Sequence, residues 1–350
     1  MPMVRALTLH VKSEKYKPQE LVQLLGDLKK SIESRGISVW TLRASFSEDL
    51  DWREAISYCG DKVMIAAYHK SVDEVRVSDL VEYLKKCGNG YATILATEDN
   101  LEYLSRLYVE LSRILSEDYF TRIGVSYGSY VQTPYFPIST AREDSVSVAY
   151  RYIDLLLSSE PNRWTEVIQE ITRKVGLFLK DVAGGIGLRV YHDISISPWM
   201  TESSVDVVEK LGAVFPEVGT LGSVYRVNRV LTEASSRIES TGFNELMMPV
   251  AEDDRLKELV KRGKLRLENL IGLSTACVAG LDMVAVPRDL NYLKNLFADT
   301  YTAFSIKKRP YGVRIVPTDK PVVELTRFGE LPAFSSYSSG VGKEPMRIRN

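Results

Sequence analysis

The sequence predicts a single α/β domain in which strands and helices alternate around a closed or nearly closed barrel. Short apolar runs rich in β-branched residues recur along the chain, and longer stretches with apolar residues at helical spacing separate them. About eight to ten strand candidates in this alternation favour a barrel over an open sheet. No spacer or internal repeat divides the chain, so we expect one domain over residues 1–350, with a loosely held tail over 335–350.

The expected strands are short, apolar and rich in valine, isoleucine and aromatic residues, which is typical of strands. In chain order they are residues 4–11, 37–47, 62–70, 91–99, 120–127, 188–196, 281–287 and 311–317. Residues 244–250 form a further apolar segment that continues the alternation of strands and helices.

Helices are expected where apolar residues recur every three or four positions. The first begins at Pro18 and ends at Gly36, because proline suits the first turn and glycine suits a left-handed cap. The others are expected over residues 78–90, 100–116, 145–157, 164–183, 204–211, 223–239, 251–263, 265–276 and 289–301.

Residues 128–144 are predicted to form a long loop. This stretch is rich in glycine, proline, serine and threonine and lacks any periodicity. Loops of more than about a dozen residues are uncommon in compact domains and are often functional. We expect a functional loop here, since the charged residues 142–144 precede the next predicted helix.

The composition is typical of a soluble globular protein and excludes two classes of partner. Apolar residues make up 45% of the chain, enough for a substantial core. Lysine and arginine total 45 against 46 aspartate and glutamate, so no net field favours nucleic acid or an anionic membrane surface. The longest apolar runs, such as residues 63–68, are far shorter than the ~20 residues of a membrane helix.

The three cysteines, Cys59, Cys87 and Cys277, indicate a reduced intracellular protein. They are widely separated, and no cysteine or histidine spacing suits a zinc site, so no metal is expected. Residues 1–12 contain no charged start followed by a long apolar segment, as a secretory signal or transit peptide would. We therefore expect a cytoplasmic protein.

Five strings, taken in order along the chain, resemble the uncharacterised family known as domain of unknown function 711. The strings are VRALTLHV, DISISP, VGTLG, PVAEDDRL and ACVAGLDMVAVP, at residues 4–11, 193–198, 218–222, 249–256 and 276–287. The fold of this family is similar to that of pyruvate formate-lyase and other glycyl radical enzymes. The resemblance implies a formate-lyase-like barrel of about ten strands and brings no established reaction.

Glycyl radical chemistry is not expected in spite of this resemblance. Enzymes of that class store the radical on a glycine in a C-terminal loop of the form Arg-Val-x-Gly-Tyr or Phe. Neither residues 311–317 nor residues 338–346 match this pattern. A fold does not carry a chemistry without the corresponding site.

The candidate catalytic residues are Cys277, Asp193 and Glu245. Cys277 lies among small residues before an apolar run, and it is either a reactive thiol or a packed side chain. Asp193, Ser195 and Ser197 share one face of a strand, since they are two residues apart. Either these polar groups line a barrel interior for a small polar ligand, with Asp193 as general base, or they hydrogen-bond to neighbouring segments.

Four further residues are candidates for binding a substrate. Arg43 and Arg142 could hold an anionic group, although arginines often pair with carboxylates instead. Gly219 and Gly222 precede a helix, where backbone NH groups can meet a phosphate or carboxylate, or they form an ordinary turn. The acidic residues 252–254 are expected to cap a helix, with metal ligation as the alternative.

These observations favour an enzyme that acts on a small polar or anionic metabolite inside the barrel, by acid-base or thiol chemistry. One alternative is a metabolite-binding regulatory protein that uses the same pocket without turnover. Another is an oligomeric structural protein, which predicts no enclosed pocket and a large exposed apolar face. No pattern assigns a cofactor, and a homo-oligomer is compatible with all three alternatives.

Overall fold

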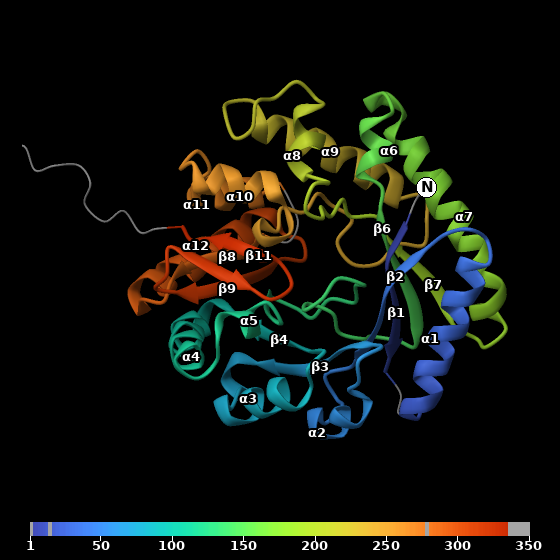
Figure 1. The fold of residues 1–350 in the computed structure, drawn as a ribbon, viewed down its shortest axis with the longest axis horizontal. Helices are drawn as coiled ribbons and strands as arrows, with labels where there is room; N and C mark the ends of the chain where they lie inside the picture. Colours follow the sequence, from blue (N-terminus) through green and yellow to red (C-terminus); the bar gives the residue numbers. More distant parts are fainter. Residues whose placement is uncertain (1–2, 13–15, 277–279, 335–350) are drawn as a thin grey trace, which may run out of the picture.

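A nine-stranded, mostly parallel sheet organises the computed structural model, which describes residues 3–12, 16–276 and 280–334 (Figure 1). The strands are β1 Met3–Val11, β2 Val39–Phe46, β3 Met64–Ser71, β4 Gly90–Ala96, β5 Ile123–Tyr127, β6 Ser145–Arg151, β7 Arg189–Asp193, β8 Leu281–Pro287 and β9 Gly312–Thr318. Their order across the sheet is β7-β6-β1-β2-β3-β4-β5-β9-β8. The pairings β1 with β6 and β5 with β9 are antiparallel, and the others are parallel. A separate hairpin joins β10 Val322–Leu325 to β11 Gly329–Pro332.

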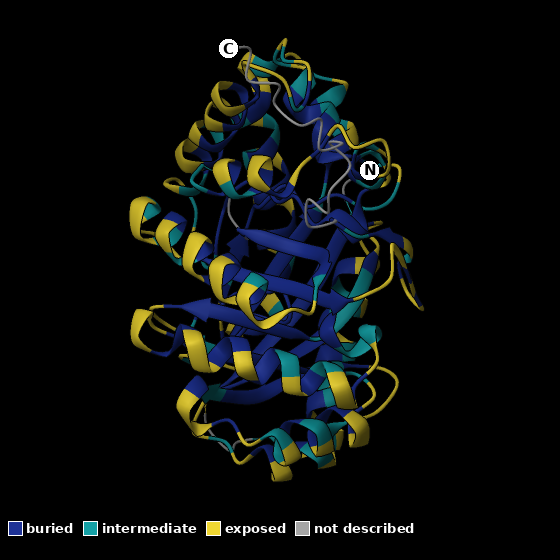
Figure 2. Ribbon diagram, turned by 90° about the vertical axis from the view of Figure 1, so that its left-hand side faces the viewer, coloured by how far each residue is buried: buried dark blue, intermediate teal, exposed yellow. Residues whose placement is uncertain are grey.

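Helices cover the outside of the curved sheet, so that the strands are buried and the outer helical faces are exposed (Figure 2). The α-helices are α1 Pro18–Glu33, α2 Trp52–Ala55, α3 Val77–Lys86, α4 Leu101–Ile114, α5 Glu117–Phe120, α6 Ile153–Leu157, α7 Trp164–Gly184, α8 Ser204–Glu209, α9 Thr220–Ser235, α10 Asp254–Lys261, α11 Leu267–Ser274 and α12 Leu290–Lys307. Short 3₁₀ helices are η1 Ile56–Tyr58, η2 Val72–Glu74, η3 Glu98–Asn100, η4 Pro161–Arg163 and η5 Val250–Glu252. No helix in the described part of the chain is long and apolar enough to cross a bilayer.

Most of the expected elements are confirmed, because their burial follows the periodicity of the sequence. The first helix begins at Pro18, and its buried residues fall at helical spacing. Gly36, just beyond its end, has a φ of +78°, the left-handed conformation expected there. The eight predicted strands are all present, and the strand predicted over residues 188–196 ends earlier, at Asp193.

Residues 145–151 are a strand, and the prediction of one helix over residues 145–157 is wrong. Here β6 pairs with β1 on one side and β7 on the other, and only the short helix α6 follows. Serines alternate with valines in β6, so Val146 and Val148 join the main apolar core while Ser145 and Ser147 occupy the other face. The alternation of serine and valine over residues 145–148 is the pattern typical of a strand, and the prediction of a helix did not take it into account.

Barrel closure is not seen among the described residues, because β7 and β8 are the two edges of the sheet. An irregular segment, residues 240–253, lies beside the β7 edge. It forms isolated parallel bridges with residues 192–200, and its end, η5, packs against β8. The fold is therefore mixed α/β with a large sheet, and the predicted strand-like segment 244–250 forms an isolated bridge without joining a regular ladder.

The predicted long loop at residues 128–144 is confirmed, and it fills the inner face of the sheet. Its residues Val131, Tyr135 and Ile138 are buried in an apolar cluster with Ala6 of β1. Two glycines of the sheet make room for it: a Cβ on Gly312 would lie 2.0 Å from Ile138 Cδ1, and Gly124 faces the same side chain. The loop is therefore part of the core and carries side chains into the interior.

Cys59 and Cys87 form a disulfide, so the expectation that all three cysteines are reduced is wrong for these two. They are 28 residues apart in sequence, but the end of η1 and the end of α3 bring their Cα atoms to 5.3 Å. Cys277 lies outside the described residues. The expectation of a loosely held tail over residues 335–350 also lies outside them.

Candidate functional site

A central cavity opens on the inner face of the sheet and has two connected lobes. The inner lobe has a volume of about 60 Å³ and lies against the loop 128–144 and the segment 243–249. The outer lobe has a volume of about 430 Å³ and lies toward α5 and the β10–β11 hairpin. Five residues line both lobes: Arg5, Arg43, Phe136, Glu252 and Arg314.

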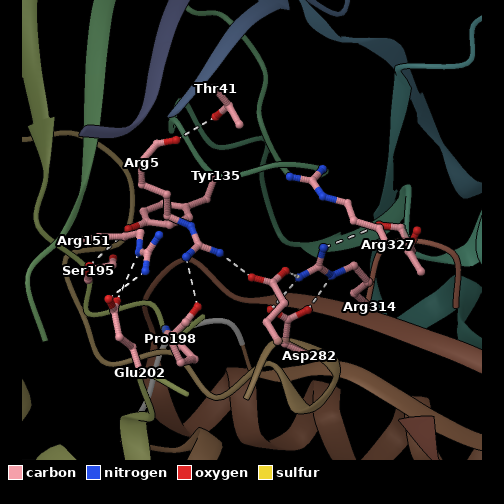
Figure 3. Close-up of polar contacts among 12 residues, drawn as sticks. Arg5, Thr41, Tyr135, Arg151, Ser195, Pro198, Glu202, Asp282, Arg314 and Arg327 are labelled. Carbon is pink, nitrogen blue, oxygen red and sulfur yellow. Dashed lines mark hydrogen bonds and ion pairs between the residues drawn. The ribbon is translucent and has the colours of Figure 1, made fainter. Parts of the chain in front are cut away.

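Two buried arginines and two buried carboxylates form a chain of ion pairs along the wall of the cavity (Figure 3). Glu252 of η5 pairs with Arg5 of β1 through one oxygen and with Arg314 of β9 through the other, at 3.1 Å. Arg314 also binds Asp282 of β8 through two hydrogen bonds of 2.6 and 3.0 Å. Each charge in this chain has a partner, which offsets much of the cost of burying it.

Local backbone structure positions these ions. The pairing of β1 with β6 shifts register between Val4 and Ala6, so that Arg5 and Ala6 both face the interior. Arg5 also donates a hydrogen bond of 2.9 Å to the Pro198 carbonyl oxygen.

Burial and pairing act in opposite directions on the two carboxyl groups. Burial would raise the pKa of Glu252, but the guanidinium groups of Arg5 and Arg314 hold it below its usual range. Burial raises the pKa of Asp282, and the nearby Glu252 adds to this rise, while Arg314 opposes it. The pair Glu252 and Asp282 is therefore electrostatically coupled through Arg314.

Arg43 of β2 is a cation of the cavity that has no carboxylate partner among the described residues. Its Nε donates to Thr41 Oγ1 at 3.1 Å, and its Nη1 donates to the Pro134 carbonyl oxygen at 2.8 Å. The guanidinium carbon lies 5.2 Å from the centre of the Phe136 ring. Arg43 is 7% exposed, and no carboxylate oxygen in the described part of the chain lies within 4.0 Å of it. Burial and the neighbouring Arg5 lower the pKa of Arg43 to about 9, so it is still a cation at pH 7.

Aromatic rings and one more arginine form the rim of the outer lobe. Trp40 and Trp199 are in edge contact, with ring centres 4.5 Å apart, and Arg5 lies 5.5 and 5.6 Å from them. Arg327, in the turn of the β10–β11 hairpin, lies 6.0 and 5.8 Å from the same two rings. The mouth of the cavity therefore combines a positive charge with planar apolar surface.

Asp193, predicted as the general base, holds loops together behind the wall of the cavity. Oδ1 accepts hydrogen bonds from the backbone and hydroxyl of Ser195 and from the Asn244 amide, and Oδ2 accepts from Thr133 and the Phe243 amide. Burial raises the pKa of Asp193, and the donors oppose the rise. These bonds occupy the lone pairs that a base needs, so the side chain is a positioning residue for the segments that line the inner lobe.

The predicted polar face on residues 193–197 divides into two parts. The Ser195 hydroxyl donates a hydrogen bond to Asp193 and accepts one from the Glu245 amide at 3.2 Å, so it belongs to the hydrogen-bond network around Asp193. Ser197 lines the inner lobe. His192 points to the other side, where its ring meets the Tyr150 hydroxyl, as the strand alternation predicts.

Glu245 lies beneath a different surface from Arg43. Its side chain is 2% exposed and pairs with Lys307 at 2.6 Å and with Arg309. It lines a groove formed with α9 and the end of α12. The structure therefore does not bring Glu245 together with Arg43 at the cavity.

The remaining predicted binding residues lie elsewhere. Arg142 is exposed and donates to the Tyr130 carbonyl oxygen. Gly219, with a φ of +103°, is the residue before α9, and Gly222 lies inside that helix. The predicted turn is therefore shorter than expected, since α9 begins at Thr220.

The acidic cluster at residues 252–254 has two roles. Asp253 caps α10 by accepting the amides of Arg255 and Leu256, as predicted, and it also binds Ser203 and Ser204 near the start of α8. The capping prediction is wrong for Glu252, which turns into the cavity. No group of three or more His, Cys, Asp or Glu side chains in the described ranges is arranged to hold a metal ion.

Sequence reasoning missed Arg5, Glu252, Asp282 and Arg314 as members of the site. Three of them are charged residues inside otherwise apolar strands: Arg5 in VRALTLHV, Asp282 in LDMVAVP and Arg314 in YGVRIVP. Such residues are rarely buried without partners, and this is the signal that could have found them.

The comparisons with known proteins agree with the resemblance noted in the sequence. The model of the family described as "Uncharacterised ACR (DUF711)" matches residues 131–329, which include Glu252, Asp282 and Arg314. The chain is similar to a "UPF0210 protein" of Methanosarcina acetivorans, with 30% identity over 171 residues, covering 46% of this chain and 37% of that protein. It is similar to proteins of the same name from Pelobacter propionicus, with 32% identity over 147 residues (40% and 32% coverage), and Neisseria gonorrhoeae, with 25% identity over 204 residues (57% and 44% coverage).

The matched part of the chain thus spans less than half the length of each of these relatives. Because the family model covers more than half of the 350 residues, the chain belongs to the uncharacterised DUF711 family, whose similar members carry the name UPF0210.

Proposed function

We propose that this protein binds a small anionic metabolite in the central cavity, with Arg43 holding the anionic group. The observation that carries the proposal is a guanidinium group that is 7% exposed, lines both lobes and has no carboxylate within 4.0 Å among the described residues. Arg5 and Arg314 differ from it, because they form ion pairs with Glu252 and Asp282.

The hydrogen-bonding geometry of Arg43 supports this proposal. Thr41 and Pro134 accept from Nε and Nη1, which fixes the plane of the guanidinium group. No hydrogen bond within the described residues uses Nη2, and a guanidinium edge is suited to a carboxylate or a phosphate. A buried cation without a counter-ion is costly, so an anionic ligand is expected to gain affinity by neutralising it.

Binding without turnover is the form of function that this site supports best. The expected enzyme needs a base or nucleophile at the ligand, but Asp193 and Glu245 are engaged in hydrogen bonds and ion pairs outside the two lobes. The role predicted for Cys277 stays a prediction. A cavity lined by charged side chains favours a ligand-binding protein over the alternative of a purely structural oligomer.

We also propose that the sheet corresponds to the formate-lyase-like barrel, with residues 240–253 in place of a tenth strand. The parallel bridges from this segment to residues 192–200 and the packing of η5 against β8 support the idea. An experimental structure in which this segment leaves the space between β7 and β8 open would contradict it.

Thermal-shift screening of small carboxylates and phosphate esters tests the proposed function. A ligand of the native state raises the melting temperature through linkage. We expect a stabilising anion for the unaltered protein, loss of that stabilisation in Arg43→Gln, and no loss in Arg142→Gln, whose guanidinium group is exposed and outside the cavity. Equal stabilisation of all three proteins would overturn the assignment. NMR of the incubated ligand then separates binding from turnover, since a new product would establish an enzyme.

A further inference from the structure

Arg327 is a second cation of the cavity without a carboxylate partner. It lines the outer lobe, and no carboxylate oxygen of the described residues lies within 4.0 Å of its guanidinium group. Its polar contact is a long one, 3.5 Å, to the Tyr91 hydroxyl group. Arg327 and Arg43 thus line the same lobe, one at the exposed rim and one at the buried end.

The two residues next to Arg327 in the hairpin turn, Thr326 and Phe328, are hydrogen-bonded to neighbouring helices. The backbone and hydroxyl of Thr326 bind Asp118 of α5 at 2.9 and 2.5 Å. The carbonyl oxygen of Phe328 accepts a hydrogen bond of 3.0 Å from Lys257 of α10. Contacts with two helices therefore fix the backbone of the turn that carries Arg327, although the side chain itself is exposed.

The other charges that line the two lobes balance one another. Glu252 and Asp282 neutralise two of the arginines through the ion-pair chain. Arg122, which also has no carboxylate oxygen within 4.0 Å among the described residues, donates to four backbone carbonyl oxygens instead, and Asp118 of the same lobe adds a third negative charge. Five arginines and three carboxylates among the described residues therefore line the two lobes, which leaves an excess of two positive charges. Arg43 and Arg327 are bound neither to a carboxylate nor to a set of carbonyl oxygens like that around Arg122.

We propose that the ligand carries two anionic groups, one bound by Arg43 at the buried end and one bound by Arg327 at the rim. This inference rests on the proposed function and names its ligand class: a dicarboxylate, or a carboxylate that also carries a phosphate. The two charges of such a ligand match the excess of two positive charges in the lining of the cavity. The rings of Phe136 and Trp199, which line the same lobe, bound the space between them and suit a carbon chain or a planar body.

Calorimetric titration with a series of straight-chain dicarboxylates of increasing length tests this inference. Each is paired with the monocarboxylate of equal chain length. We expect one length of dicarboxylate to bind at least tenfold more tightly than its monocarboxylate in the unaltered protein. A second arm replaces one carboxylate by a phosphate and shows which anion the rim prefers.

Variants of Arg327 and Arg43 distinguish the inference of a dianionic ligand from the proposed function on which it rests. Arg327→Gln is expected to remove the tenfold advantage while leaving monocarboxylate affinity within about twofold, and Arg327→Lys should restore part of the advantage. Arg43→Gln is expected to abolish binding of both ligands. If monocarboxylates bind through Arg43 but Arg327→Gln leaves the ratio unchanged, the dianion inference is wrong and the proposed function stands. If neither ligand binds the unaltered protein, both are wrong.

Discussion

At the scale of single residues, buried polar side chains in this protein are held by partners distant in sequence. Arg5 and Glu252 are 247 residues apart, and Arg314 and Glu252 are 62 apart. A charged residue inside an apolar strand can be recognised in a sequence, but its partner cannot. This is why Arg43 could be predicted as a candidate anion site. The ion pairs among the other charged residues of the cavity, which occupy the carboxylates that could otherwise pair with Arg43, could not be predicted.

The three histidines are the residues whose burial has the clearest consequence for pH dependence. Burial lowers the pKa of His10 to about 3 and the pKa values of His69 and His192 to about 4. Since the unfolded chain has histidine pKa values of ~6.5, it binds more protons than the folded protein at lower pH. Their contribution to stability is therefore fully present above about pH 6.5 and is lost as the pH falls toward the folded values.

We predict that none of the three histidines is protonated in the folded protein at pH 5.5. The measurement is an NMR titration of the imidazole ring protons between pH 8 and pH 5.5, in which all three signals should keep the shifts of neutral rings. A histidine that titrates with a midpoint near 6.5 would show that its ring is reached by water.

At the scale of elements, regular structure could be predicted well and irregular structure could not. The strand β1 and the helix α1 carry a single period over many residues, so periodicity and burial agree. In β6 the two serines are buried, where Ser145 accepts a hydrogen bond from Gln132 and Ser147 bonds to His10, and these distant partners cannot be recognised in the sequence. The loop 128–144 and the segment 240–253 adopt their conformations through tertiary hydrogen bonds to Asp193, which no local pattern reveals.

A substitution at Gly242 tests the hydrogen-bond network around Asp193. A Cβ at this position, where φ is +75°, would lie 2.1 Å from Asp193 Oδ2. Gly187 is a matched control, because its φ is +74° and a Cβ there would meet nothing within 4 Å. We expect Gly187→Ala to lower the free energy of unfolding by about 1 kcal/mol, and Gly242→Ala by about 3 kcal/mol or more, since strain and a clash with a buried carboxylate combine.

Urea unfolding of both variants at pH 7 gives these values. Equal losses for the two variants would show that Asp193 can move, and that it does not fix the inner wall of the cavity.

In the whole molecule, the order of the strands in the sheet and the loop 128–144 bring the charged residues of the central cavity together. The ion-pair chain joins β1, which lies near the start of the sequence, to η5, β8 and β9, which lie in its last third. The α/β class and the inward-facing arginine of β2 could be predicted from the sequence. The open edges of the sheet, the disulfide and the balance of charges in the cavity depend on the order in which strands assemble, so local patterns did not predict them.

The most direct measurement of the central claim is a crystal structure of the protein soaked with selenate, an anion located by its anomalous signal. We predict a selenate ion in the central cavity, with an oxygen atom about 2.8–3.2 Å from a guanidinium nitrogen of Arg43, and no such ion in crystals of Arg43→Gln. An empty cavity in the unaltered protein at a concentration that loads other surface sites, or the same ion in the variant, would contradict the claim.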